Sequence, residues 1–434
     1  MLSVHQHWDP LKVCVVGRCY PPEYFNYIQN KKVRDTFHRI ANETEEDYQK
    51  LISVLEKFGV KTIRTDISEN PEHHFRDGYM IPPPMVPRDY TAMVGNKFFM
   101  PGKNYGKNIN LEQELKNIFR SSSLAIRNAT DSQKDLLKYV YDLTFPGRPV
   151  SPTSQHMLLK SKDQIKKGYI KTFLQCLDTK DLQELVLQGH TQTIGMNSKY
   201  VHDDKNYPYK TLQKFLAENG NEITYDQYIN TAMMTRVGKD LYFGLGNIVT
   251  KLNEDNFTRK WKKLFPDYRI HPVSIPGHGD GSFCPVKPGL IISLRNEENY
   301  KKTFPGWEIV YLEGESWAKV KPFLNKKNKS VGRYWVPDAG DDFYDFVNEW
   351  MNDWVTYVEE TVFDVNMLVI DEKNVICNNK NKKVFDAFER HGITPHIVNF
   401  RHRYFWDGGL HCITSDIHRD GEQKDYFPTR EMDQ

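Results

Sequence analysis

The sequence predicts one pseudo-symmetric α/β domain built from repeats of a strand, a turn, a second strand, a helix and a third strand. By pattern this order recurs about five times along the 434 residues, which favours one repetitive domain over two or three separate ones. Hydrophobic residues make up 39% of the chain and aromatic residues 13%. This composition is typical of a folded protein with a substantial core and argues against disorder.

The clearest unit spans residues 363–400. The apolar run VNMLVI (365–370) predicts a buried strand, and the turn DEKN leads into a second strand, VIC (375–377). The segment KKVFDAFERHG (382–392) has the apolar spacing of an amphipathic helix and stops at a glycine. The run ITPHIVNF (393–400) predicts the third strand.

Four other parts of the chain repeat all or part of this order. They are a strand, helix and strand at 10–18, 35–58 and 60–66; a strand pair at 89–100; a strand pair, helix and strand at 237–247, 253–265 and 267–275; and a strand pair, helix and strand at 286–294, 296–302 and 307–312. One or two such matches would mean little, because hairpins and helices are common. Five in series indicate a repeated fold.

Residues 111–201 fit the pattern poorly, because they are helix-rich and polar with a Pro/Ser-rich break, GRPVSPTSQ. We interpret them as an insertion in the second unit of a single domain covering 1–434. The insertion is either a surface elaboration, a lid or a dimer contact. The polar tail after Gly421 is expected to be poorly ordered.

The charge balance excludes several kinds of partner. The chain has 59 basic and 57 acidic residues, a net charge of +2, so bulk charge predicts no nucleic-acid or membrane-surface partner. No apolar run approaches the ~18 residues of a membrane helix, and the N-terminus shows neither a signal nor a transit pattern. The six cysteines are scattered without a CxxC pair, which predicts a reduced, cytoplasmic protein without a zinc site.

Three segments contain residues that could perform chemistry. Glycines surround His278 and Asp280 in PGHGDGS, where backbone can approach a ligand and the Asp can orient the imidazole. Cys412 follows Gly408, Gly409 and a histidine, and a reactive thiolate needs such open space and a nearby cation. Asp89 enters a strand from VPRD and is suited to anchor a cation. The alternatives are a solvated turn histidine, an inert core cysteine and a turn-capping aspartate.

Five motifs together resemble the glycine amidinotransferase family of the pentein superfamily. They are WDPLKVCVVGR near the start, PRDYTAMVGN at Pro87, GHGDGSF at Gly277, DVNMLVIDEKNVI at Asp364 and GGLHCITSDIHR at Gly408. The resemblance covers both ends and most of the chain except residues 111–201. It implies the pentein α/β-propeller, with five ββαβ-type units around a pseudo-fivefold axis, and transfer of an amidino group from arginine to an acceptor amine.

The resemblance also implies residue roles. Cys412 matches the family's nucleophile, His278 its acid/base, and Asp89 and Asp280 its guanidinium-binding carboxylates. Carboxylates bind the planar guanidinium bidentately and localise its charge, so that the thiolate can attack its carbon while the histidine protonates the departing amine. The product is an amidino-cysteine, from which an acceptor amine then displaces the sulfur in a ping-pong reaction.

One departure from the family pattern affects the catalytic set. The family's remaining catalytic carboxylate falls on Asn230, which keeps the shape and loses the charge. Either Asn230 holds the substrate as a neutral acceptor, or Asp226 one turn earlier substitutes, or activity is reduced.

A second departure affects the pocket for the donor's carboxylate. The family's Arg and Ser-Ser positions fall on Glu297 and on Glu359 and Glu360, while Arg295 lies near enough to serve after a small shift. Three acids would repel an α-carboxylate and attract an amine, which favours an agmatine-like donor or a cationic acceptor. The alternative is that the register slips and these acids line the surface.

The sequence therefore predicts an amidinotransferase that acts on a small guanidino donor and an amine acceptor. It predicts no cofactor, no metal, no nucleic-acid or membrane partner, and leaves a homodimer open. Water in the second half-reaction would instead make the protein a guanidine hydrolase of the deiminase or dihydrolase type. A binding homologue with impaired catalysis is the third hypothesis, motivated by Asn230.

Overall fold

The computed structural model describes twelve stretches of the chain. They are residues 1–76, 79–100, 205–225, 231–244, 258–259, 261–273, 278–294, 300–312, 335–351, 354–355, 365–406 and 408–431. All of them belong to one compact unit, which comprises Met1–Gly102, Asp204–Asn247 and Thr258–Gln434.

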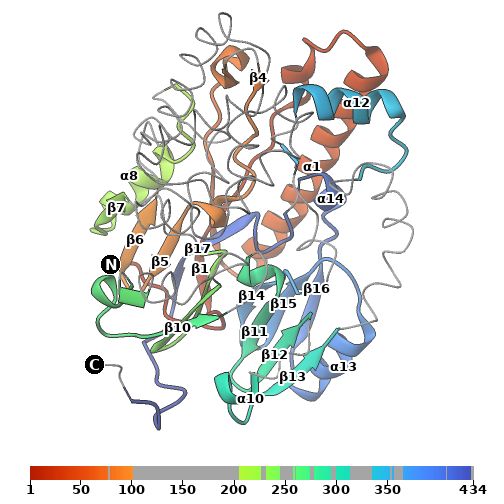
Figure 1. The fold of residues 1–434 in the computed structure, drawn as a ribbon. Coiled ribbons are helices and arrows are strands. Elements are labelled where there is room, and N and C mark those ends of the chain that lie inside the picture. The colour runs from red at the N-terminus through yellow and green to blue at the C-terminus, as the bar shows by residue number, and fades with distance from the viewer. Residues whose placement is uncertain are drawn as a thin grey trace, which may run out of the picture. The chain divides into compact units, whose positions relative to one another are not determined.

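Five three-stranded sheets in the described part share one pattern of pairing (Figure 1). In each sheet the central strand is antiparallel to one neighbour and parallel to the other. The sheets are β17 (Thr414–Arg419), β1 (Leu11–Val16) and β2 (Lys61–Arg64); β5 (Ala92–Val94), β6 (Lys97–Met100) and β7 (Ile223–Tyr225); β8 (Met234–Val237), β9 (Asp240–Gly244) and β10 (Arg269–Val273); β11 (Phe283–Lys287), β12 (Leu290–Ser293) and β13 (Glu308–Tyr311); and β14 (Leu368–Asp371), β15 (Asn374–Cys377) and β16 (Thr394–Ile397). A short ladder of β3 (Phe75–Arg76) and β4 (Tyr79–Met80) accompanies them.

Helices connect the parallel strands of these sheets, because a parallel neighbour can be reached only by a crossover. The helices are α1 (Lys31–Lys57), α8 (Lys210–Glu218), α10 (Tyr300–Thr303), α12 (Asp341–Trp350), α13 (Lys382–Arg390) and α14 (Arg403–Trp406), and the short 3-10 turns are η1 (Pro22–Phe25), η2 (Pro71–His74), η3 (Pro87–Asp89) and η5 (Gly279–Gly281). Helix α1 leads from β1 to β2, and α13 leads from β15 to β16. None of the helices in the described stretches is both long and apolar enough to cross a membrane.

The last unit illustrates why these residues form these elements. Asn381 caps α13 by accepting hydrogen bonds from the backbone N–H groups of Lys383 and Val384, at 3.0 and 3.3 Å. Its apolar face is buried, while the strands β14 and β15 are buried on nearly every residue. Near-continuous burial is typical of strands covered on both faces. The elements predicted within 363–400 are confirmed, as are the predicted strands of the other units and the helix predicted at 35–58. The helices predicted at 253–265 and 296–302 lie partly outside the described residues.

The first sheet joins distant parts of the chain. Strand β1 lies between β2, which follows α1, and β17, and Val16 of β1 pairs with Thr414 of β17. The nucleophile candidate, Cys412, immediately precedes β17. The pairing with β1 therefore fixes the position of the segment that carries the cysteine.

The prediction of a poorly ordered tail after Gly421 is wrong. The tail's Lys424 accepts a backbone hydrogen bond from Lys239 at 2.9 Å, and Tyr426 accepts one from the Trp8 indole at 2.9 Å. Phe427 is buried. The tail is held by backbone hydrogen bonds and ion pairs. The spacing of hydrophobic residues in the sequence does not reveal such contacts. A side chain at Gly238, which has a φ of +63°, would collide with the tail.

Candidate active site

Cys412 is held in a buried turn ahead of β17. Asn366, which precedes β14, contacts this turn through both ends of its side-chain amide: its Oδ1 accepts from the backbone N–H of His411 at 2.8 Å and of Cys412 at 3.2 Å, and its Nδ2 lies 3.0 Å from the Cys412 Sγ. A Cβ on Gly409 would lie 2.5 Å from the Asn366 Oδ1, so glycine is required for this approach. The close approach of Asn366 thus explains why a glycine stands at position 409, in the Gly-rich run before the cysteine.

Asp280 brings a carboxylate to the sulfur. It lies in η5, whose Gly279 donates its backbone N–H to the Ala232 carbonyl at 2.7 Å. The Asp280 Oδ2 is 3.6 Å from the Cys412 Sγ and 2.7 Å from the His411 Nδ1. Asp280 and Cys412 are both buried. The carboxylate is therefore fixed beside the thiol by a histidine from the nucleophile's own turn.

His278 and Asp89 form the second pair of the site. The His278 Nδ1 lies 3.8 Å from the Asp89 Oδ1, and both side chains are partly exposed. The sequence suggested that Asp280 orients His278, two residues away. In the structure Asp89 of η3 lies beside His278, and Asp280 accepts a hydrogen bond from His411.

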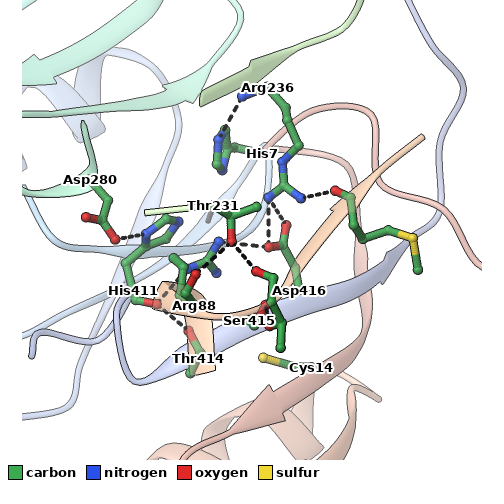
Figure 2. A network of polar contacts seen from close by, with 12 residues as sticks. His7, Cys14, Arg88, Thr231, Arg236, Asp280, His411, Thr414, Ser415 and Asp416 are labelled. Atoms are coloured by element: carbon green, nitrogen blue, oxygen red, sulfur yellow. Dashed lines mark hydrogen bonds and ion pairs between the residues drawn. The ribbon is translucent and has the colours of Figure 1, made fainter. Parts of the chain in front are cut away.

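Hydrogen bonds connect the segments that hold these two pairs (Figure 2). The Arg88 Nε donates to the His411 carbonyl at 2.7 Å, which ties the Asp89 segment to the Cys412 turn. The Thr231 hydroxyl donates to the Arg88 carbonyl at 3.2 Å and to the Thr91 carbonyl at 2.7 Å. The structure therefore brings together the four residues Cys412, His278, Asp89 and Asp280 from connected segments of different units.

Beneath the site, three arginines surround one buried aspartate. Asp416 of β17 contacts Arg88 at 2.9 Å, Arg236 at 2.7 Å and Arg419 at 2.8 Å, and all four side chains are at most 1% exposed. Figure 2 shows Asp416 with Arg88 and Arg236. Burial alone would raise the pKa of Asp416, but the three guanidiniums outweigh burial and hold the pKa well below its usual value. The sequence analysis missed this network, because its members are far apart in the sequence.

We expect Asp416→Asn to destabilise the protein by about 3–5 kcal/mol, because it leaves three buried guanidiniums without their carboxylate. Because the folded-state pKa is depressed, this stabilisation is present above the unfolded-state value near 4 and is lost as pH falls through the folded value. Denaturant unfolding at neutral pH measures the change. Asp386→Asn, which removes an exposed ion pair with Lys382, is the control and should change stability little. Equal stability of the two variants would contradict the prediction.

Two histidines near the site are buried and neutral. Burial is the largest cause that lowers the pKa of His411 well below its usual value, followed by Arg88 and His7. Burial and Arg236 lower the pKa of His7 in the same way. A neutral His411 donates its Nδ1 proton to Asp280 without cancelling the carboxylate's charge. His411 therefore contacts Asp280 as a neutral hydrogen-bond donor rather than as a cation.

A small cavity adjoins this histidine pair. It is lined by His7, Met234, Thr235, Asp280, Phe283, Cys284, Pro285, Val365, Met367 and His411. Cys412 is not among its lining residues. The cavity thus lies against the supporting side chains Asp280 and His411 rather than against the sulfur.

Three other described cysteines have a raised thiol pKa. Burial raises the pKa of Cys14 and of Cys284 to about 12, and that of Cys19 well above its usual value. These thiols stay protonated at neutral pH. Cys412 differs from them in its neighbours, because an amide N–H and a carboxylate both contact its sulfur.

Several predicted site residues lie outside the described residues. They are Asn230 and its alternative Asp226, and the donor-pocket residues Arg295, Glu297, Glu359 and Glu360. Their roles remain predictions. Among the described residues, the sequence analysis missed Asn366, because a single polar residue in the run VNMLVI has no recognisable spacing. His411 was noticed only as a neighbour of the cysteine.

Known proteins that resemble this chain are amidinotransferases. The chain is 28% identical over 233 residues to the mitochondrial glycine amidinotransferase of Xenopus tropicalis, which covers 52% of this chain and 47% of the relative. It is 24% identical over 208 residues to the L-arginine:L-lysine amidinotransferase of Pseudomonas savastanoi pv. phaseolicola, which covers 47% of this chain and 48% of the relative. The chain thus spans about half the length of the curated relatives it matches. No protein-family model matches it.

The fold is shared with a solved amidinotransferase. The structure of SxtG, an amidinotransferase from Microseira wollei in the saxitoxin biosynthetic pathway, aligns over 98% of this chain and 99% of its own with a TM-score of 0.50 and 16% identity. The structural match establishes a shared fold. The resemblance to the glycine amidinotransferase family that the sequence motifs suggested is confirmed by the two curated relatives, which are both amidinotransferases.

Proposed function

We propose that this protein is an amidinotransferase that moves an amidino group from a guanidino donor to an acceptor amine through a covalent adduct on Cys412. The observation that carries the proposal is the arrangement of Cys412 against Asp280, with His278 and Asp89 on connected segments. The relatives named glycine amidinotransferase and L-arginine:L-lysine amidinotransferase support the reaction class.

In the first half-reaction the two carboxylates bind the guanidinium of the donor. Asp280 lies beside the sulfur and Asp89 beside His278, so a planar cation held by both would place its carbon near the nucleophile. The Cys412 thiolate forms a bond to that carbon. The bond from carbon to the departing nitrogen then breaks, and this amine leaves with a proton from His278.

In the second half-reaction the acceptor amine enters where the first amine left. It attacks the amidino carbon and gives a proton to His278, which restores the protonated imidazole. The carbon–sulfur bond breaks and the electron pair returns to Cys412 as a thiolate. Charge and protons balance over the cycle, and the reaction is ping-pong because the first product leaves before the acceptor reacts.

We further propose that the five sheets surround a pseudo-fivefold axis as in the pentein fold, in a single domain over 1–434 with an insertion at 111–201. The common pairing pattern of the five sheets supports this arrangement. Strand β6 ends at Met100 and its parallel neighbour β7 begins at Ile223, so the second unit is interrupted by a long segment in the sequence.

A donor and acceptor screen tests the proposed function. The enzyme is incubated with arginine, agmatine or canavanine in the presence of an amine panel, and the products are identified by mass spectrometry. A new guanidino compound made from the added amine supports transfer. Formation of a ureido product in water would make the protein a hydrolase, and no reaction with any donor would refute an enzymatic role in this chemistry.

We expect agmatine to be the better donor than arginine. The motivation is that Glu297, Glu359 and Glu360 stand where the family has Arg, Ser and Ser, so that an incoming α-carboxylate would meet like charge. The measurement is kcat/KM for both donors. A Glu359→Gln variant should raise kcat/KM for arginine and leave kcat/KM for agmatine unchanged. If arginine is preferred by roughly tenfold, about 1.4 kcal/mol, the acidic pocket is refuted and Arg295 becomes the carboxylate-binding candidate.

A further inference from the structure

We propose that Asn366 is a further catalytic residue, whose side-chain amide both positions Cys412 and stabilises its thiolate by donating a hydrogen bond to the sulfur. The inference rests on the proposed function only in taking Cys412 as the nucleophile. It concerns the preparation of the sulfur for attack, a step that precedes any contact with donor or acceptor.

The orientation of the Asn366 amide follows from its partners. A backbone N–H can only donate, and two of them, from His411 and Cys412, point at one end of the amide at 2.8 and 3.2 Å. That end must therefore be the oxygen. The NH₂ group then faces the Cys412 Sγ at 3.0 Å, which is a short distance for an N–H to sulfur contact.

Burial makes this hydrogen bond effective. Asn366 is 0% exposed and Cys412 is 1% exposed, so bulk water does not compete for the amide or for the sulfur. A hydrogen bond to the charged form of a group favours that form, and bonds to an ionised acceptor are stronger than bonds to a neutral one. The amide N–H therefore stabilises the thiolate more than the thiol.

The carboxylate of Asp280 makes such a donor necessary. Its Oδ2 lies 3.6 Å from the same sulfur, and a like charge at this distance disfavours a thiolate. Asp280 is required to hold a guanidinium, so the repulsion is built into the site. The Asn366 Nδ2 also lies 3.5 Å from the Asp280 backbone carbonyl, so one amide connects the nucleophile to the segment that carries the carboxylate.

The test is the pH dependence of Cys412 alkylation by iodoacetamide in an Asn366→Asp variant. Aspartate keeps an oxygen for the two backbone N–H groups and replaces the N–H donor by an oxygen. We expect alkylation at neutral pH to slow on the order of 10–100-fold and its pH midpoint to rise by about one to two units. Peptide mass spectrometry quantifies the Cys412 peptide alone, so the other cysteines do not contribute.

Asn221→Asp is the matched control. Asn221 is also buried and makes three hydrogen bonds through its amide, to the backbone of Leu2 and Asn96, outside the candidate site. This control should leave the alkylation midpoint unchanged. An unchanged midpoint in a folded Asn366→Asp variant would overturn the inference, because the loss of the N–H donor and the added carboxylate charge both act to raise the midpoint.

Gly409→Ala provides a second route in case Asn366→Asp does not fold. Its new Cβ would meet the Asn366 amide, with the Oδ1 at 2.5 Å, and displace it without changing its chemistry. The same upward shift is expected, and an unshifted midpoint would count against the inference. Alkylation needs no guanidino donor, so failure of amidino transfer with every donor would refute the proposed function and leave this result interpretable.

Discussion

Cys412→Ala is expected to abolish amidino transfer, because an amide donor and a carboxylate both contact the Cys412 sulfur. In the native protein, incubation with donor alone should add one amidino group to the peptide that carries Cys412. Intact-protein and peptide mass spectrometry measure this adduct. The Cys412→Ala substitution is expected to remove the covalent route completely rather than to weaken donor binding.

Cys14→Ala is the control for this variant. Cys14 lies in β1 and burial raises its pKa to about 12, so its removal should leave both the adduct and the turnover in place. Retained turnover in Cys412→Ala would end the hypothesis of a covalent intermediate on this residue. An adduct found on a different peptide would also end this hypothesis.

His278→Asn is expected to lower turnover by roughly 10²–10⁴-fold, the usual contribution of a positioned general acid/base. The donor should still bind, since Asp89 and Asp280 remain. Rates come from steady-state assays, and donor affinity comes from calorimetry in a Cys412→Ala background, where chemistry is blocked. A fall in turnover with nearly constant affinity is the expected combination.

His396→Asn, in β16 and hydrogen-bonded to Asn374 at 3.0 Å, is the matched control and should keep its turnover. Near-normal turnover in His278→Asn would show that another group transfers the proton. A loss of donor binding equal to the loss of turnover would instead assign His278 to substrate binding.

The repeated elements were predictable because each is specified by a local pattern. The run from β14 to β16 alternates apolar strands, a turn and an amphipathic helix within about 30 residues, as is usual for such a unit. Strand β7 and helix α8 were not predicted, since they are separated from β6 by a long stretch that does not fit the pattern. The tail was misjudged for a related reason, because its contacts with Trp8 and Lys239 are with residues far away in the sequence.

The residues of the candidate site also fall into those that the sequence revealed and those that it did not. Cys412, His278, Asp280 and Asp89 stand in glycine-rich or turn segments whose composition and motifs draw attention to them. The side chains that position these four residues have no such local signal in the sequence. Asn366 stands in an apolar run, and Arg88 acts through the His411 carbonyl 323 positions away, a pairing that only the folded chain defines.

The position of β17 in the sequence determines when the cysteine turn can form during synthesis. The cysteine turn is anchored by β17, whose partner β1 is synthesised long before it; Arg419 donates to the carbonyl of Asp9, 410 positions earlier. A nascent chain can complete the local units while β1 still lacks this neighbour. The proposed nucleophile is therefore set in place only after β17 has been made, and incomplete chains that end before Thr414 cannot form the pairing that holds it.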